Sequence, residues 1–270
     1  MSEQPRRFCF ANAALLLMAG AIAAFPQEVP SDLLRQGRQM DIAGNYAEAR
    51  KLFTEVLDHA NTPELKAQAQ RSLAVSYAFE GDCKNAVKHE APLYENYLAA
   101  KSYFDAGETA DELARICIDA GDLDTASEWY AKGHAAGMNE PEEKQKDLWT
   151  FRWEHAQARI AARRGEQAEA QKHVAAAKAV LDKGAIPEQA QFFPYLKGYV
   201  AFYAGDYKAA LEELKLANQN DPFIQCMMGQ TYEKLGNKEK AIEYYRMALA
   251  ATFHSPPAAY AVPFARKKLS

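Results

Sequence analysis

Residues 229–250 read GQTYEKLGNKEKAIEYYRMALA and show most fully the pattern that organises this chain. Gly236 and Asn237 interrupt two stretches in which small and aromatic residues recur at helical spacing. Glycine adopts the left-handed conformation that ends a helix, and asparagine suits the start of the next helix. Ala241 and Tyr245 follow one and two turns into the second stretch. The segment therefore predicts two helices that are joined by a tight turn and approach closely at an alanine.

The same glycine-to-alanine spacing of five residues occurs six times along the chain. The pairs are Gly44/Ala49, Gly81/Ala86, Gly121/Ala126, Gly165/Ala170, Gly205/Ala210 and Gly236/Ala241. Asn, Asp or Glu follows the glycine in every copy. A unit that recurs at this interval is typical of a helical repeat array, in which neighbouring hairpins bury one continuous core. We therefore expect an all-α architecture of about six helix hairpins.

This pattern resembles the tetratricopeptide repeat, most clearly in residues 222–250, 33–57 and 198–217, while the middle copies are degenerate. The resemblance implies a right-handed α-solenoid over residues 31–254. It also implies a non-catalytic scaffold that mediates protein–protein interactions through its concave surface. The sequence lacks the Lys and Asn set with which some members of the family clamp a carboxylate.

The two ends of the chain differ from the repeats. Residues 1–24 combine a basic head, an apolar run and a small-residue cleavage pattern, which are typical of a signal peptide, and residues 25–30 read as a linker. This predicts a periplasmic or secreted protein of a bacterial cell envelope, and an uncleaved membrane anchor is the alternative. Residues 255–270 predict either a capping helix, with Tyr260 and Phe264 inward and the basic residues 266–268 outward, or a flexible tail.

Composition and motifs narrow the function. The formal net charge is −4, so the chain lacks the basic footprint of a general nucleic-acid binder. We find no metal-binding histidine spacing, phosphate loop, dinucleotide fingerprint or nucleophile elbow. We therefore expect no catalytic residue, no cofactor and no metal. Cys83 and Cys117 fall on adjacent predicted hairpins, where they either pair or, like Cys226, are buried separately.

In the tetratricopeptide family the first helix of each hairpin lines the concave face, and the repeat register places eight polar or aromatic residues there. These residues are Arg38, Arg71, Arg115, His155, Arg159, Tyr195, Tyr199 and Gln230. Arginine binds carboxylates through two parallel hydrogen bonds, so we expect acidic groups on a protein or peptide partner. The aromatic residues of segment 192–207 either pack between hairpins or offer a stacking surface. A module for a glycan or small acid and a membrane-tethered assembly factor are the alternative functions.

Overall fold

The computed structural model describes residues 30–270, so the expected signal peptide and the linker up to residue 29 lie outside the described residues. Every regular element of the described part is helical. The first half contains α1 (Pro30–Ala43), α2 (Tyr46–Asp58), α3 (Pro63–Ala78), α4 (Cys83–Ala99), α5 (Tyr103–Ala120) and α6 (Leu123–Gly137). The second half contains α7 (Glu143–Arg164), α8 (Gln167–Asp182), the 3-10 helix η1 (Pro187–Phe192), α9 (Phe193–Tyr203), α10 (Tyr207–Leu214), α11 (Pro222–Lys234), α12 (Lys238–Leu249) and α13 (Pro256–Leu269).

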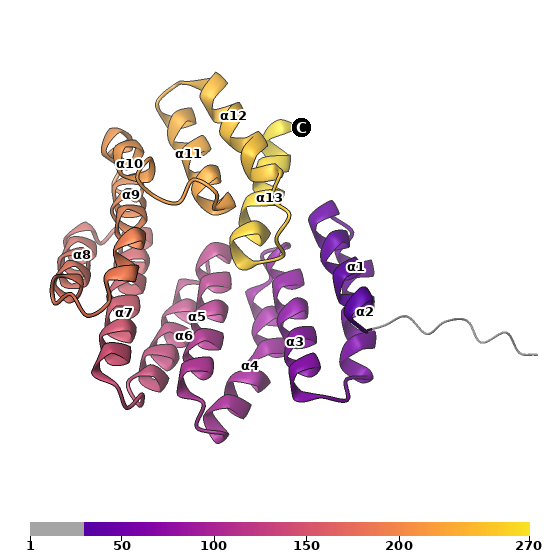
Figure 1. Ribbon diagram of the computed structural model, residues 1–270. Helices are drawn as coiled ribbons and strands as arrows, with labels where there is room; N and C mark the ends of the chain where they lie inside the picture. Colours follow the sequence, from indigo (N-terminus) through magenta and orange to yellow (C-terminus); the bar gives the residue numbers. More distant parts are fainter. Residues whose placement is uncertain (1–29) are drawn as a thin grey trace, which may run out of the picture.

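Helices α1 to α12 pair consecutively into six hairpins that follow one another along an arc (Figure 1). The predicted all-α solenoid is therefore confirmed. Each hairpin turn holds its glycine at positive φ. The values are 99° at Gly44, 70° at Gly81, 91° at Gly121, 77° at Gly165, 82° at Gly205 and 80° at Gly236.

The residue after the glycine starts the second helix in four of the hairpins. Asp82, Asp122, Asp206 and Asn237 each accept a hydrogen bond, 3.0–3.1 Å long, from the backbone N–H three residues ahead. This bond satisfies one of the amide groups that a helix leaves unpaired at its N-terminus. The repeated two-residue turn therefore both ends one helix and caps the next.

Small residues inside the hairpins let the helices approach closely. A Cβ atom added to Gly229 would lie 2.5 Å from the Tyr245 ring, and one added to Gly37 would lie 2.4 Å from the Phe53 ring. The repeat alanines are likewise buried, with exposed fractions of 3% or less. The pairing of a small residue with an aromatic ring thus explains the pattern seen in residues 229–250.

A disulfide joins the second and third hairpins. Cys83 at the start of α4 is bonded to Cys117 near the end of α5, and their Cα atoms lie 4.8 Å apart. Cys226 is buried as a free thiol, and burial raises its pKa to about 12. Cys83 and Cys117, whose pairing the sequence left undecided, are therefore covalently linked.

The C-terminal helix α13 closes the solenoid on itself. It packs on α11 and α12 and also contacts α1, α3 and α5 from the first three hairpins (Figure 1). Ala258 and Val262 of α13 share a buried cluster with Val75 and Phe79 from the second hairpin. The concave side is consequently a partly enclosed interior.

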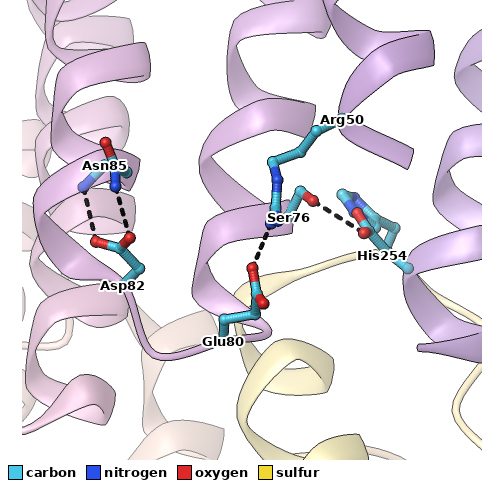
Figure 2. A network of polar contacts seen from close by, with 7 residues as sticks. Arg50, Ser76, Glu80, Asp82, Asn85 and His254 are labelled. Carbon is cyan, nitrogen blue, oxygen red and sulfur yellow. Dashed lines mark hydrogen bonds and ion pairs between the residues drawn. The ribbon is translucent and has the colours of Figure 1, made fainter. Parts of the chain in front are cut away.

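A buried polar contact, which we call the clasp, links the segment before α13 to the first hairpins. His254 Nε2 lies 2.7 Å from the Asp41 carboxylate, which also accepts a 2.9 Å hydrogen bond from Ser76 (Figure 2). The His254 ring lies 5.6 Å from the ring centroids of both Phe53 and Phe79. The clasp therefore fixes the chain just before α13 against residues more than two hundred positions earlier.

The tail forms a helix and not a flexible segment. The Tyr260 ring lies 4.9 Å from that of Phe223, and Phe264 packs inside as expected. The expectation that Arg266 points outward is wrong, because it donates a 2.7 Å hydrogen bond to the Ile42 carbonyl. This difference follows from closure, which brings α1 to a side of α13 that would face water in an open array. Within residues 30–270, no helix is both long and apolar enough to cross a membrane.

Candidate functional site

The partly enclosed interior contains a cleft of about 710 Å³, which we call the concave cleft. Its walls come from α5, α6 and α7, from η1 with α9, and from residues 216–224 between and within α10 and α11. Pro256 and Pro257, at the start of α13, complete it. Clefts of this size are typical of sites for small ligands or for anchoring side chains of a partner.

Four of the eight residues predicted for the concave face line this cleft: Arg115, His155, Arg159 and Tyr195. Arg115 comes from α5, His155 and Arg159 from α7 and Tyr195 from α9. These are the first helices of the third, fourth and fifth hairpins. The structure thus brings these four predicted residues together, and they form the basic side of the cleft.

Arg159 is a buried cation whose neighbours leave it incompletely paired. Arg159 is 5% exposed, and its Nη2 atom donates a 2.6 Å hydrogen bond to the Tyr130 hydroxyl. Its Nε atom has no hydrogen-bond partner. Within residues 30–270, no carboxylate oxygen lies within 4 Å of this guanidinium. The charges of Asp111 and Asp119 act on Arg159 only from beyond that distance, so this buried guanidinium lacks a direct carboxylate partner.

Arg115 is better compensated. Its Nε donates a 2.8 Å hydrogen bond to the Asp119 carboxylate one turn later, and its guanidinium lies 4.2 Å above the centre of the Phe223 ring. The Nη2 atom of Arg115 nevertheless lacks a partner. One face of this guanidinium is therefore held by the protein, while a second, buried donor is left unpaired.

The other polar groups of the basic side are neutral near pH 7. Burial, together with the charges of Arg159 and Arg115, holds the pKa of His155 well below its usual range. Burial raises the pKa of Tyr130 to about 12. The His155 Nε2 atom and the Tyr195 hydroxyl have no hydrogen-bond partner. The cleft therefore offers fixed positive charge from arginine and further uncharged hydrogen-bonding groups.

The cleft also has an acidic side, which shares one face of α5 with Arg115. Glu108, Asp111 and Glu112 come from one face of α5 and line the cleft with Arg152 of α7. Arg152 pairs with Glu108 and lies 4.0 Å from Asp111. Burial raises the pKa of Asp111 to about 7. The two sides together carry opposite charges within one cavity.

A second carboxyl lies behind this acidic side. Glu90 of α4 is fully buried, and Arg71 lies 3.6 Å from Glu90 and 3.8 Å from Glu112. Burial raises the pKa of both Glu90 and Glu112. The charge of Glu112 raises the pKa of Glu90 further, whereas a hydrogen bond with Glu90 lowers that of Glu112. Arg71 therefore stabilises a buried acidic pair and does not line the cleft, contrary to its predicted place.

Three other predicted residues also lie outside the cleft. Arg38, on α1, is half-buried and lies near His254. Burial lowers the pKa of His254, Asp41 raises it, and the charge of Arg38 adds to the lowering. Tyr199 is 1% exposed and packs on Phe223 in the core. Gln230 lies 3.4 Å from the Tyr260 hydroxyl of α13. The role of these three residues in binding a partner stays a prediction.

Sequence reasoning also missed several lining residues. Glu108, Asp111, Glu112 and Arg115 follow a spacing of three, four and seven residues, so their common face was readable from the helix period. Tyr130 lies on a second helix, which the register assigns to the outside. The loop residues and Pro256 had no comparable signal, because they reach the cleft only through closure.

The acidic and basic groups are held by neighbouring helices, and no group of three metal-ligating side chains occurs in residues 30–270. The fold and the cleft together define a helical-repeat array whose interior surface can receive part of a partner or a ligand.

The comparison with protein families agrees with this class. The tetratricopeptide repeat model matches residues 224–252, which form α11, α12 and the turn between them. Residues 224–252 of this chain are therefore similar to a tetratricopeptide repeat. Repeats of this family generally mediate protein–protein interactions.

Among solved structures, the chain is similar to a tetratricopeptide repeat protein from Parabacteroides merdae, with 12% sequence identity. The match covers 88% of this chain and 98% of that chain, with a TM-score of 0.34. No curated protein matches the sequence.

Proposed function

We propose that this protein is an exported, non-catalytic scaffold that binds a protein partner through the concave cleft and recognises acidic groups on that partner. The family supports the general role in protein–protein interaction. The charges of the cleft support the acidic specificity. The bacterial cell envelope is the proposed location.

The observation that carries the acidic specificity is the incomplete pairing of Arg159. This guanidinium is 5% exposed, faces the cleft and is hydrogen-bonded to a neutral tyrosine hydroxyl. A carboxylate from a partner would supply the missing counter-ion and would accept a charge-assisted hydrogen bond. Arg115 Nη2 offers a second donor in the same cavity.

Export is supported by the disulfide between Cys83 and Cys117. Structural disulfides persist in oxidising compartments such as the bacterial periplasm and are rare in the cytosol. The sequence pattern of residues 1–24 suggests the same location. Intact-mass measurement of the natively produced protein should show a chain that begins near Ala24 or Phe25. Retention of Met1 would indicate an anchor or a chain that is not exported.

The binding proposal is tested by affinity capture from bacterial envelope extract on the immobilised mature chain. We compare wild type with Arg159→Gln, which removes the incompletely paired cation. Arg164→Gln is the matched control, since Arg164 lies on the same helix but outside the cleft and pairs with Asp124 at 2.6 Å. Captured proteins are identified by mass spectrometry and eluted with increasing salt.

We expect a defined partner to bind wild type and Arg164→Gln and to be lost from Arg159→Gln. Binding should weaken as salt rises, because ions screen the approach of charged surfaces. Equal capture by all three chains would place the interaction surface outside the concave cleft. Circular dichroism of each variant checks that the helices are intact.

A further inference from the structure

We propose that the clasp is an acid-sensitive latch, which holds α13 against the first hairpins near neutral pH and loosens this contact in mild acid. His254 is the group that takes up the proton, and Asp41 is its partner across the contact. The proposal concerns closure of the array and is independent of the partner that the concave cleft binds. Closure also shapes that cleft, because Pro256 and Pro257 line it and follow His254 closely in the chain.

The two side chains of the clasp are withdrawn from water. The His254 side chain is 4% exposed and that of Asp41 is 0% exposed, with 2.7 Å between the ring Nε2 and Asp41 Oδ2. The other carboxylate oxygen accepts the hydrogen bond from the Ser76 hydroxyl (Figure 2). The rings of Phe53 and Phe79 lie against the imidazole. Because both Asp41 oxygens act as acceptors, the carboxylate is ionised and a neutral imidazole suffices to donate its Nε2–H.

The surroundings of the clasp disfavour a positive charge on His254. The other charged or titratable groups around it are Arg38 of α1, Tyr46 and Arg50 of α2, Glu80 just after α3 and Arg266 of α13. Glu80 pairs with Arg50 at 2.5 Å (Figure 2), and Tyr46 is neutral because burial raises its pKa above 10.0. A protonated His254 in the closed array would therefore have Asp41 as its carboxylate partner and arginines on three neighbouring helices.

The stability of the closed array should consequently depend on pH. Burial holds the pKa of His254 below its ordinary value of 6.5, although Asp41 partly opposes this effect. When α13 is released, the ring lies in water and takes up its proton near pH 6.5. Closure is thus fully favoured above pH 6.5 and weakens as the pH falls, by at most about tenfold per pH unit for one proton. Burial raises the pKa of Asp41 above 3.8, which acts in the opposite sense and confines the loss to mild acid.

Hydrogen exchange followed by mass spectrometry measures the latch. An isolated helix of this length is marginal in water, so the amides of α13 exchange once it is released. The purified chain is compared at about pH 7.5 and about pH 5.5, after correction for the intrinsic pH dependence of amide exchange. Peptides from α13 report on closure, and peptides from α8, which packs on α7 and α9, are the internal reference.

Two variants test the role of His254. His254→Gln keeps a side-chain N–H donor for Asp41 but does not titrate. His59→Gln is the matched control, because it replaces an exposed histidine of the first hairpin. We expect protection of α13 in wild type and in His59→Gln to fall about threefold to tenfold in acid, while α8 stays unchanged. In His254→Gln, protection of α13 should be the same at both pH values.

Arg38→Gln gives a second test, in which both clasp residues are retained. The charge of Arg38 helps to lower the pKa of His254, so its removal favours the proton in the closed array. The acid-induced fall in protection of α13 should therefore be smaller than in wild type.

Equal protection of α13 in wild type at the two pH values would overturn the proposal. A fall in His254→Gln as large as in wild type would also overturn it, as would an equal fall in α8, which indicates general destabilisation by acid. If His254→Gln leaves α13 unprotected even near neutral pH, glutamine does not replace the clasp and Arg38→Gln decides. A smaller fall in Arg38→Gln then supports the latch, and a fall as large as in wild type contradicts it.

Discussion

The clasp makes a quantitative prediction about closure. Replacing Asp41 with alanine removes a carboxylate that is fully buried and that pairs with His254 at 2.7 Å and Ser76 at 2.9 Å. Each buried partner left without a hydrogen bond costs about 1–3 kcal/mol. Burial raises the pKa of Asp41, so relief from its desolvation offsets part of this loss. We expect a net decrease of about 2–4 kcal/mol in the free energy of unfolding.

Urea unfolding followed by circular dichroism measures this decrease. The matched control is Asp182→Ala, which removes an exposed carboxylate that pairs with Lys178 on the same helix, and it should change stability by less than about 0.5 kcal/mol. Small-angle scattering should also show a larger radius for Asp41→Ala if α13 separates from the first hairpins. Equal unfolding midpoints for the two variants, with an unchanged radius, would refute the reasoning that the clasp holds the solenoid closed.

Three further predictions concern the turns, the disulfide and the cleft. Gly205 has a φ of 82° and no atom within 4 Å of an added Cβ. Gly205→Val should therefore lower the free energy of unfolding by about 1–2 kcal/mol through backbone strain alone. A urea midpoint equal to that of wild type would contradict this. Replacing both Cys83 and Cys117 with alanine should lower the free energy of unfolding by about 3–4 kcal/mol, by the chain-entropy account for a separation of 34 residues. The control Cys226→Ala should not show this loss. Equal urea midpoints for the reduced and the oxidised wild type would argue against a structural role of the disulfide. Capture of an acidic partner should strengthen roughly threefold to tenfold between pH 8 and pH 6, because burial raises the pKa of Asp111 to about 7, and its protonation removes a charge that repels the partner's carboxylates. Capture should show this rise in wild type and a flat pH profile in Asp111→Asn.

The sequence predicted the hairpins well because their determinants are local. A glycine that must adopt positive φ, a capping side chain and a small residue facing an aromatic ring all lie within one repeat, as Gly236, Asn237, Gly229 and Tyr245 show. The site was predicted only in part, because the direction of a side chain depends on how successive hairpins rotate. That rotation is a property of the packing between repeats, and the sequence of one repeat does not report it.

The acidic side of the cleft was not predicted from the sequence for a different reason. The face shared by Glu108, Asp111, Glu112 and Arg115 was visible in the helix period, but its burial was not. The carboxylate of Asp111 lies against Gly133 of α6 and 4.0 Å from Arg152 of α7. Burial there raises the pKa of Asp111 to about 7. The packing of α6 and α7 on this face of α5 is not encoded in the pattern of α5 alone.

Closure also explains why a single arginine can give this cleft its selectivity. An exposed arginine in an open groove contributes little to binding, because water and salt screen its charge. Arg159 is only 5% exposed, and near a buried guanidinium a counter-charge gains more from the lower dielectric. The wall formed by Pro256 lies two residues after His254, which the clasp binds to Asp41. Loss of the clasp would therefore let water reach Arg159 and weaken carboxylate binding, although Asp41 itself does not line the cleft.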